Sequence, residues 1–130
     1  IVINGDVLTN MNFSKLLDSH VHNDALATMC VREFQYQIPY GVVNSEKNII
    51  KNMTEKPSYF FDINTGIYVI SPELLAQVEA QFINMPTILE QQIEKKNKVI
   101  SYPLHEYWLD IGHIEDYNRA QKDIYSLGLS

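Results

Sequence analysis

The sequence begins Ile1-Val2-Ile3-Asn4-Gly5-Asp6, and this stretch decides the fold. Its three apolar residues predict a strand buried on both faces, because no polar side chain alternates with them. After residues 10–12, apolar residues recur at spacings of three and four, which predicts an amphipathic helix. These residues are Phe13, Leu16, Leu17 and Val21. A buried strand followed by a helix is typical of an α/β fold.

The rest of the chain continues this alternation of strands and helices. Apolar runs predict strands at residues 25–31, 40–43, 48–54, 60–70, 99–102 and 107–111. Helix-start signals predict helices from Ser71-Pro72 to about Ala80, from Met85-Pro86 through Ile93, and over residues 114–127 before Gly128. We therefore predict an α/β fold with a mixed, mostly parallel sheet flanked by helices. Because no cap or turn precedes the first strand, residues 1–130 are expected to form one partial domain whose N-terminal strands are missing.

Composition excludes several classes of protein. Hydrophobic residues make up 45% and charged residues 20%, the balance of a folded globular protein. A net charge of -6 argues against a nucleic-acid-binding protein, and no apolar run is long enough to cross a membrane. The single Cys30 excludes an internal disulfide framework, so we expect a cytoplasmic protein in which Cys30 packs as a small apolar residue.

Two aspartates follow apolar strands at comparable places in the chain. Asp6 follows the first strand, and Asp110 follows the run Trp108-Leu109. Ligands bind at the carboxyl ends of strands in such sheets, and two carboxylates there suit a hard cation such as Mg²⁺. Each aspartate has an alternative interpretation: Asp6 as a residue of an Asn4-Gly5 hairpin turn, and Asp110 as a loop residue that bonds nearby backbone N–H groups.

A second set of polar residues lies around the middle strands. Glu55-Lys56-Pro57 follows a predicted strand, and Pro57 is expected to hold Lys56 in an extended backbone. The carboxylate and the ammonium suit a sugar phosphate, although so short a motif by itself favours a solvated turn. Gly41 and Gly66 lie within strand-rich segments, where glycine marks either a close approach or a bulge.

The remaining polar and aromatic residues give weaker signals. Tyr40, next to Gly41, is the aromatic residue most suited to face a sugar. The four histidines predict no metal pair, because the two closest in sequence are two apart on a helix and do not share a face. We interpret His20, His22, His105 and His113 as surface residues or as structural residues with satisfied hydrogen bonds.

Taken in order, five motifs resemble one family, the sugar-phosphate nucleotidyltransferases, which include mannose-1-phosphate guanylyltransferase and glucose-1-phosphate thymidylyltransferase. The motifs are Asn4-Gly5-Asp6, Pro39-Tyr40-Gly41-Val42-Val43, Thr54-Glu55-Lys56-Pro57, Asn64-Thr65-Gly66-Ile67-Tyr68 and Trp108-Leu109-Asp110-Ile111-Gly112. The resemblance covers nearly the whole chain. It implies a nucleotide-diphospho-sugar transferase-like, Rossmann-like fold.

The resemblance also implies a reaction and roles for the matching residues. The family transfers a nucleoside monophosphate from an NTP to a sugar 1-phosphate, which gives an NDP-sugar and pyrophosphate. Asp6 and Asp110 would hold Mg²⁺, and Lys56 would contact phosphate. Gly41, Glu55 and Asn64 would contact the sugar. The segments 36–43 and 85–87 look most similar to bacterial guanylyltransferase-like enzymes of surface-sugar biosynthesis, which makes GTP the expected donor.

The chain departs from the family at its start, where members carry a glycine-rich loop followed by Arg and Lys. All five glycines here are isolated, and neither Arg32 nor Arg119 adjoins such a loop. We therefore expect the chain alone to be inactive, and a non-catalytic sugar-phosphate-binding or regulatory module is the alternative function. The first strand would also have an uncovered edge, which predicts self-association of the chain.

Overall fold

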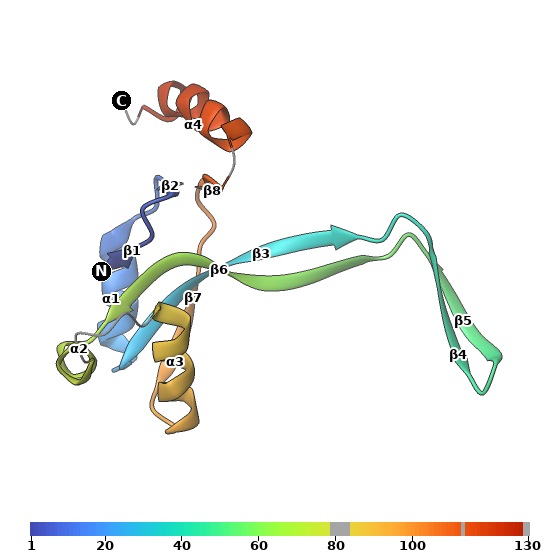
Figure 1. Ribbon diagram of the computed structural model, residues 1–130, viewed down its shortest axis with the longest axis horizontal. Coiled ribbons are helices and arrows are strands. Elements are labelled where there is room, and N and C mark those ends of the chain that lie inside the picture. Colours follow the sequence, from blue (N-terminus) through green and yellow to red (C-terminus); the bar gives the residue numbers. More distant parts are fainter. Residues whose placement is uncertain (79–83, 113, 129–130) are drawn as a thin grey trace. The chain divides into compact units, whose positions relative to one another are not determined.

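A computed structural model describes residues 1–78, 84–112 and 114–128 of the chain. The chain divides into two compact units (Figure 1). The first unit contains Ile1–Val31 and Asn64–Ser130, and the second contains Arg32–Ile63. No helix among the described residues is both long and apolar enough to cross a membrane.

The elements alternate much as the sequence predicts. The strands are β1 (Val2–Ile3), β2 (Val7–Thr9), β3 (Ala27–Gln37), β4 (Gly41–Glu46), β5 (Ile49–Glu55), β6 (Ser58–Ile70), β7 (Val99–Pro103) and β8 (Trp108–Asp110). The helices are α1 (Phe13–His22), α2 (Pro72–Gln77), α3 (Met85–Glu94) and α4 (Ile114–Leu127).

The first unit contains a mixed sheet of four strands in the order β1-β6-β3-β7. Strand β3 pairs with β7 in parallel, with Ala27 opposite Val99, whereas β1 pairs with β6 antiparallel, with Val2 opposite Tyr68. The mixed sheet is confirmed, but the parallel share is smaller than predicted. The physical reason is that the chain leaves β3, passes through the β4–β5 hairpin and comes back along β6. The neighbouring strands β3 and β6 therefore run in opposite directions (Figure 1).

Helices cover both faces of this sheet, because successive residues of its central strands point to opposite sides. On one face, Ile67 of β6 packs in a core cluster with Leu16 of α1. On the other face, Tyr68 packs with Leu74 of α2 and Leu89 of α3. The flanking helices predicted from the sequence thus pack on the sheet and form two separate hydrophobic cores, one on each face.

Three details of the predicted helices are wrong. Ser71 occupies the N-cap position of α2, but its hydroxyl makes no capping bond and instead donates to the Ala25 carbonyl oxygen at 2.9 Å. Helix α2 ends at Gln77, short of Ala80, which lies outside the described residues. In α3, Ile93 is 57% exposed, so it does not share the buried face of Ile88 and Leu89.

Strand β1 is also less buried than predicted. Val2 is 37% exposed and Ile3 is 43% exposed. The cause is its place at the edge of the four-stranded sheet, where β6 is its one partner among the described strands. The apolar run of residues 1–3 reflects an edge strand with an unpaired side, and not a strand enclosed on both faces.

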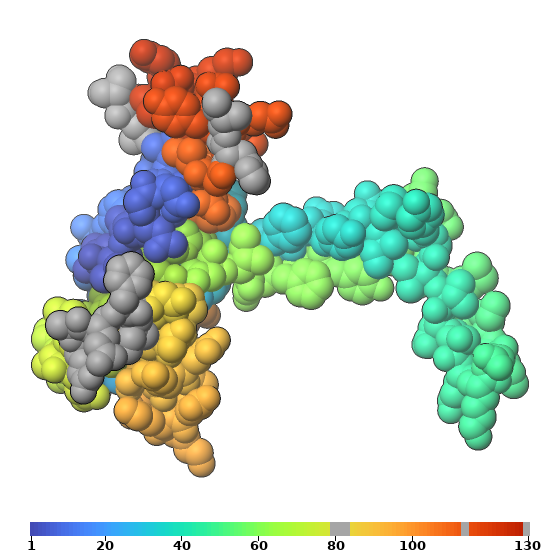
Figure 2. Space-filling model, in the orientation of Figure 1, coloured from blue at the N-terminus to red at the C-terminus, as the bar shows by residue number. Residues whose placement is uncertain are grey.

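The second unit is a ribbon of paired strands with no buried side chain between residues 32 and 63. In Figure 2 its atoms form a narrow band in which the cyan and the green parts run side by side. Strands β4 and β5 form a hairpin whose turn residues Lys47 and Asn48 both have positive φ, 50° and 66°, as a type I′ turn requires. Strand β6 is continuous through residues 64–66, although the sequence Asn64-Thr65-Gly66 interrupts the apolar run.

Candidate functional site

The structure brings Asp6 and Asp110 to adjacent positions of one two-stranded sheet. Strands β2 and β8 pair antiparallel, with Val7 directly opposite Asp110. The carbonyl oxygen of Asp6 accepts a hydrogen bond of 2.7 Å from the backbone N–H of Ile111. Residues 104 positions apart in the sequence are therefore one register step apart in space, and both are exposed.

Asp6 lies in a tight turn, although not in the hairpin of the alternative interpretation. The backbone N–H of Val7 donates to the Asn4 carbonyl oxygen at 3.3 Å, which closes a turn over Gly5 and Asp6. Strands β1 and β2 on either side of it belong to different sheets. The turn thus redirects the chain from the large sheet to the pair that contains Asp110.

These two aspartates fit a magnesium ion that is shared with a substrate. Mg²⁺ is commonly held by one or two carboxylates together with substrate phosphates and water. No group of three or more His, Cys, Asp or Glu side chains among the described residues could enclose a metal. A carboxylate pair at an exposed strand edge therefore matches the open type of site, in which the ligand completes the coordination.

The second unit holds Tyr40, Gly41, Glu55 and Lys56 at the base of the β4–β5 hairpin. Gly41 lies directly opposite Glu55. A Cβ atom at position 41 would come within 3.2 Å of the Glu55 Oε2 atom, so the carboxylate lies over the glycine backbone. Tyr40 is 74% exposed, and its carbonyl oxygen accepts a hydrogen bond from the Lys56 N–H at 3.2 Å.

Lys56 does not have the extended backbone that was expected before Pro57. Its φ is 44°, in the left-handed region. This conformation accompanies the junction between β5 and β6, where the Lys56 carbonyl oxygen accepts from the Gln37 side chain at 3.2 Å and Ile38 N–H donates to the Pro57 carbonyl oxygen at 3.0 Å. Backbone bonds on both sides of the junction thus hold Lys56 in place despite a sparsely populated φ.

Asn64 and Gly66 belong to the first unit, and each has a defined local role. Asn64 donates through Nδ2 to the Tyr68 hydroxyl at 2.7 Å and accepts the Gly66 N–H at 2.8 Å. A Cβ at position 66 would lie 2.5 Å from Asn4 Nδ2, and φ of Gly66 is 78°. Gly66 therefore lies at a close approach, but its neighbour is the Asn4 side chain and not the ligand or second backbone that was expected.

The histidines are structural or exposed where the structure describes them. His20 is buried, with Nδ1 2.7 Å from Thr28 Oγ1 and Nε2 2.8 Å from Ser71 Oγ. Because the Ser71 hydroxyl donates to Ala25, its oxygen accepts from Nε2–H, which leaves Nδ1 to accept from Thr28. Burial lowers the pKa of His20. The side chains of His22 and His105 are exposed, and His113 lies outside the described residues.

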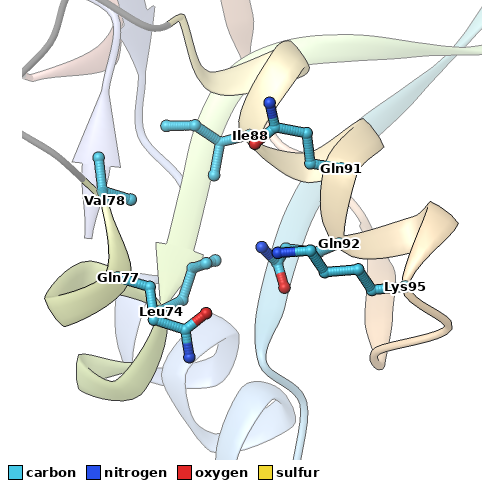
Figure 3. A pocket seen from close by; sticks show the side chains of 7 residues that line it. All are labelled: Leu74, Gln77, Val78, Ile88, Gln91, Gln92 and Lys95. Carbon is cyan, nitrogen blue, oxygen red and sulfur yellow. The ribbon is translucent and has the colours of Figure 1, made fainter.

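A pocket that the sequence did not predict lies between α2 and α3 and has a volume of about 190 Å³. Figure 3 shows that its side chains come from the two facing helices. They are Leu74, Gln77, Val78, Ile88, Gln91, Gln92 and Lys95. None of the predicted site residues lines it, and its volume is below the roughly 300–1,000 Å³ of typical ligand pockets.

Comparison with known proteins identifies the family. The family model described as nucleotidyl transferase matches residues 1–126. The chain belongs to this nucleotidyl transferase family. Its predicted resemblance to the sugar-phosphate nucleotidyltransferases is thereby confirmed.

Curated relatives agree with this assignment. The chain is 31% identical over 123 residues to the mannose-1-phosphate guanylyltransferase catalytic subunit beta of Drosophila melanogaster, covering 89% of the chain and 32% of that protein. It is 32% identical over 126 residues to the mannose-1-phosphate guanyltransferase of Schizosaccharomyces pombe, covering 89% of the chain and 33% of that protein. The chain thus spans about a third of the length of these relatives.

Solved structures confirm the fold. The crystal structure of HddC from Yersinia pseudotuberculosis superposes with a TM-score of 0.62 at 21% identity, covering 94% of this chain and 53% of that one. A second structure of HddC, complexed with GMP-PN, gives the same TM-score at 19% identity, covering 94% and 53%. The mixed sheet with flanking helices is therefore the Rossmann-like fold of nucleotidyltransferases.

Proposed function

We propose that this chain supplies the metal-binding and sugar-binding portion of a sugar-1-phosphate nucleotidyltransferase. The reaction would transfer a nucleoside monophosphate from an NTP, with GTP as the donor, to a sugar 1-phosphate, releasing pyrophosphate. The observation that carries the proposal is the adjacency of Asp6 and Asp110 across β2 and β8. The names of the guanylyltransferase relatives support GTP and mannose 1-phosphate as the substrates to test first.

The two aspartates would hold Mg²⁺ through carboxylate oxygens. The ion would neutralise charge on the phosphates as the sugar phosphate oxygen attacks the α-phosphorus in line. Asp6 is positioned by the turn after Asn4, and Asp110 by its pairing with Val7. Because each comes from a short backbone-bonded segment, their separation depends on the β2–β8 pairing.

The second unit would bind the sugar phosphate. Glu55 would accept hydrogen bonds from sugar hydroxyls, and Lys56 would meet the phosphate as a point charge. Gly41 permits this arrangement, because its missing Cβ leaves the Glu55 carboxylate room over the strand. Tyr40 is exposed beside it and would face the sugar ring. In the first unit, Asn64 is proposed as a sugar contact by the family resemblance, and its amide retains one N–H and one lone pair for such a bond.

Three further points belong to the same proposal. The protein would act in the cytoplasm, in the synthesis of a bacterial surface polysaccharide. The isolated chain would be inactive, because its few, scattered basic residues do not provide the clustered donors that a triphosphate needs. Isolated chains would also associate through the exposed edge of β1.

Calorimetric titration of the chain with mannose 1-phosphate tests the sugar-binding role. We expect binding by the wild type that is lost in Glu55→Gln and in Lys56→Met and kept in Lys51→Met, an exposed lysine of the same hairpin. Equal binding by all four proteins would refute the assigned residues. Binding to the chain together with a lack of turnover in the complete protein would favour the alternative, a non-catalytic sugar-phosphate-binding module.

A further inference from the structure

One face of the second unit consists of aromatic side chains. Alternate residues of a strand share a face. Phe34 and Tyr36 therefore lie on one face of β3. Tyr59 and Phe61 likewise lie on one face of β6. The relation between the two strands follows from one hydrogen bond, which joins the side chains of Gln35 and Ser58 at 3.1 Å.

Because Gln35 and Ser58 meet on one side of the ribbon, the residues that alternate with them lie on the other side. Phe34, Tyr36, Tyr59 and Phe61 therefore form a single surface, here called the aromatic face. Their exposed fractions are 49%, 54%, 41% and 57%. The opposite face carries mostly polar side chains, which are Glu33, Gln35, Gln37, Ser58 and Asp62, together with Phe60.

The aromatic face of this ribbon has no covering layer within its own unit. A two-stranded ribbon gains stability from a further strand or a covering layer. No side chain between residues 32 and 63 is buried within the chain. Four half-exposed aromatic side chains clustered on one side form the kind of apolar patch that marks an interaction site.

We infer that the aromatic face is covered by the same face of a second copy of this chain. Charge favours this occupant. Residues 32–63 contain four basic and four acidic side chains, so this unit is neutral, and the net charge of -6 lies entirely in the rest of the chain. Two copies can therefore meet through this unit without the like-charge repulsion that contacts between acidic units would bring.

The geometry of the face fits a symmetric contact, and its area sets the strength of that contact. Two identical sheet faces related by a twofold axis are self-complementary, and sheets stack about 10 Å apart with interdigitating side chains. An aromatic side chain buries about 150–250 Å² in full, so four half-exposed ones offer roughly 400 Å² per copy. This lies below the roughly 800 Å² per partner of a stable complex, so the dimer is weak and depends on concentration.

Sedimentation velocity of the whole chain over a concentration series tests this inference. Phe61→Ser is the informative variant, and Phe60→Ser is the matched control, since Phe60 is 58% exposed and lies on the opposite face. We expect the wild type and Phe60→Ser to dimerise alike, and Phe61→Ser to raise the dimer dissociation constant roughly tenfold or more. Circular dichroism on each variant confirms that it is folded.

Three results would overturn the inference. The first is a wild-type chain that stays monomeric at its highest soluble concentration. The second is an equal effect of Phe60→Ser and Phe61→Ser, and the third concerns the edge strand. Ile3→Lys, on the edge strand β1, separates the two modes of association: loss of the dimer in Ile3→Lys with no loss in Phe61→Ser would assign the contact to the strand edge. Mass, and not sugar-phosphate binding, is measured, so the outcome is independent of the proposed function.

Discussion

Gly41 lies directly opposite Glu55 in the β4–β5 hairpin, and the glycine leaves room for the carboxylate. A methyl group at position 41 would meet Glu55 Oε2 at 3.2 Å, which is tighter than most contacts of a Cβ atom. The carboxylate is the end of a flexible side chain, so it can move aside. A change at Gly41 should therefore displace Glu55 without unfolding the hairpin.

Gly41→Ala is expected to separate stability from binding. Alanine restricts the unfolded chain more than glycine does, so the free energy of unfolding should stay the same or rise by up to about 1 kcal/mol. Mannose 1-phosphate should nevertheless bind more weakly, because the Glu55 carboxylate has shifted. Urea denaturation and calorimetry on the same preparation measure the two effects. Unchanged affinity would show that Glu55 does not contact the ligand.

Gly66→Ala, unlike Gly41→Ala, should lower the free energy of unfolding of the first unit. The residue has φ of 78°, and a Cβ would lie 2.5 Å from Asn4 Nδ2 and 2.9 Å from Asn4 Cγ. We expect a loss of about 1–3 kcal/mol in the free energy of unfolding. Asn4→Ala in the same chain should recover the steric part of the loss and leave the part due to φ. A Gly66→Ala chain as stable as the wild type would contradict the close approach.

The buried His20 predicts that stability falls in mild acid. Burial, and secondarily the positive N-terminus, lower its pKa in the folded chain, so folding favours the neutral ring. Between the lowered pKa and the ordinary value near 6.5, the unfolded chain binds more protons. This contribution to stability is therefore complete above about pH 6.5 and decreases as the pH falls below it.

Urea denaturation at a series of pH values measures this dependence. His20→Gln should reduce it, whereas His22→Gln, an exposed histidine on the same helix, should leave it unchanged. The expectation would be wrong if the wild type became more stable as the pH falls from 7 to 5 while His20→Gln did not.

Cys30 should be unreactive in the folded chain. It is fully buried, as the sequence predicted, and burial raises the pKa of its thiol to about 12, so little reactive thiolate forms at neutral pH. Reaction with a thiol reagent such as dithionitrobenzoate should be slow without denaturant and fast in urea. Rapid labelling of the native chain would mean that the core around β3 opens readily.

Much of the fold is predictable from local patterns. The periodicity of Leu16 and its neighbours predicts α1, and the Pro86 signal predicts α3, because capping and burial act within a few residues. The burial of β1 was overestimated because an apolar run has the same appearance in a central strand and at a sheet edge. The sequence also missed the left-handed Lys56, whose conformation depends on bonds from Gln37 and Ile38.

The sequence indicates which residues could form the candidate site, but it does not show how these residues are arranged in space. Asp6 and Asp110 were identified because each follows an apolar strand, but the β2–β8 pairing that joins them spans nearly the whole chain. The aromatic face was missed for a similar reason. Alternation in β3 and in β6 is visible in the sequence, but the bond between Gln35 and Ser58 is what places the two sets of side chains on one side.

The most direct test of the central claim is calorimetric titration of the chain with GDP-mannose, with and without Mg²⁺. Asp6→Asn and Asp110→Asn each remove one carboxylate charge, and Asp18→Asn, an exposed aspartate on α1, is the control. We expect the wild type and Asp18→Asn to bind only with Mg²⁺, and both site variants to lose this binding. Magnesium-dependent binding that survives in Asp6→Asn and Asp110→Asn would contradict a shared metal site.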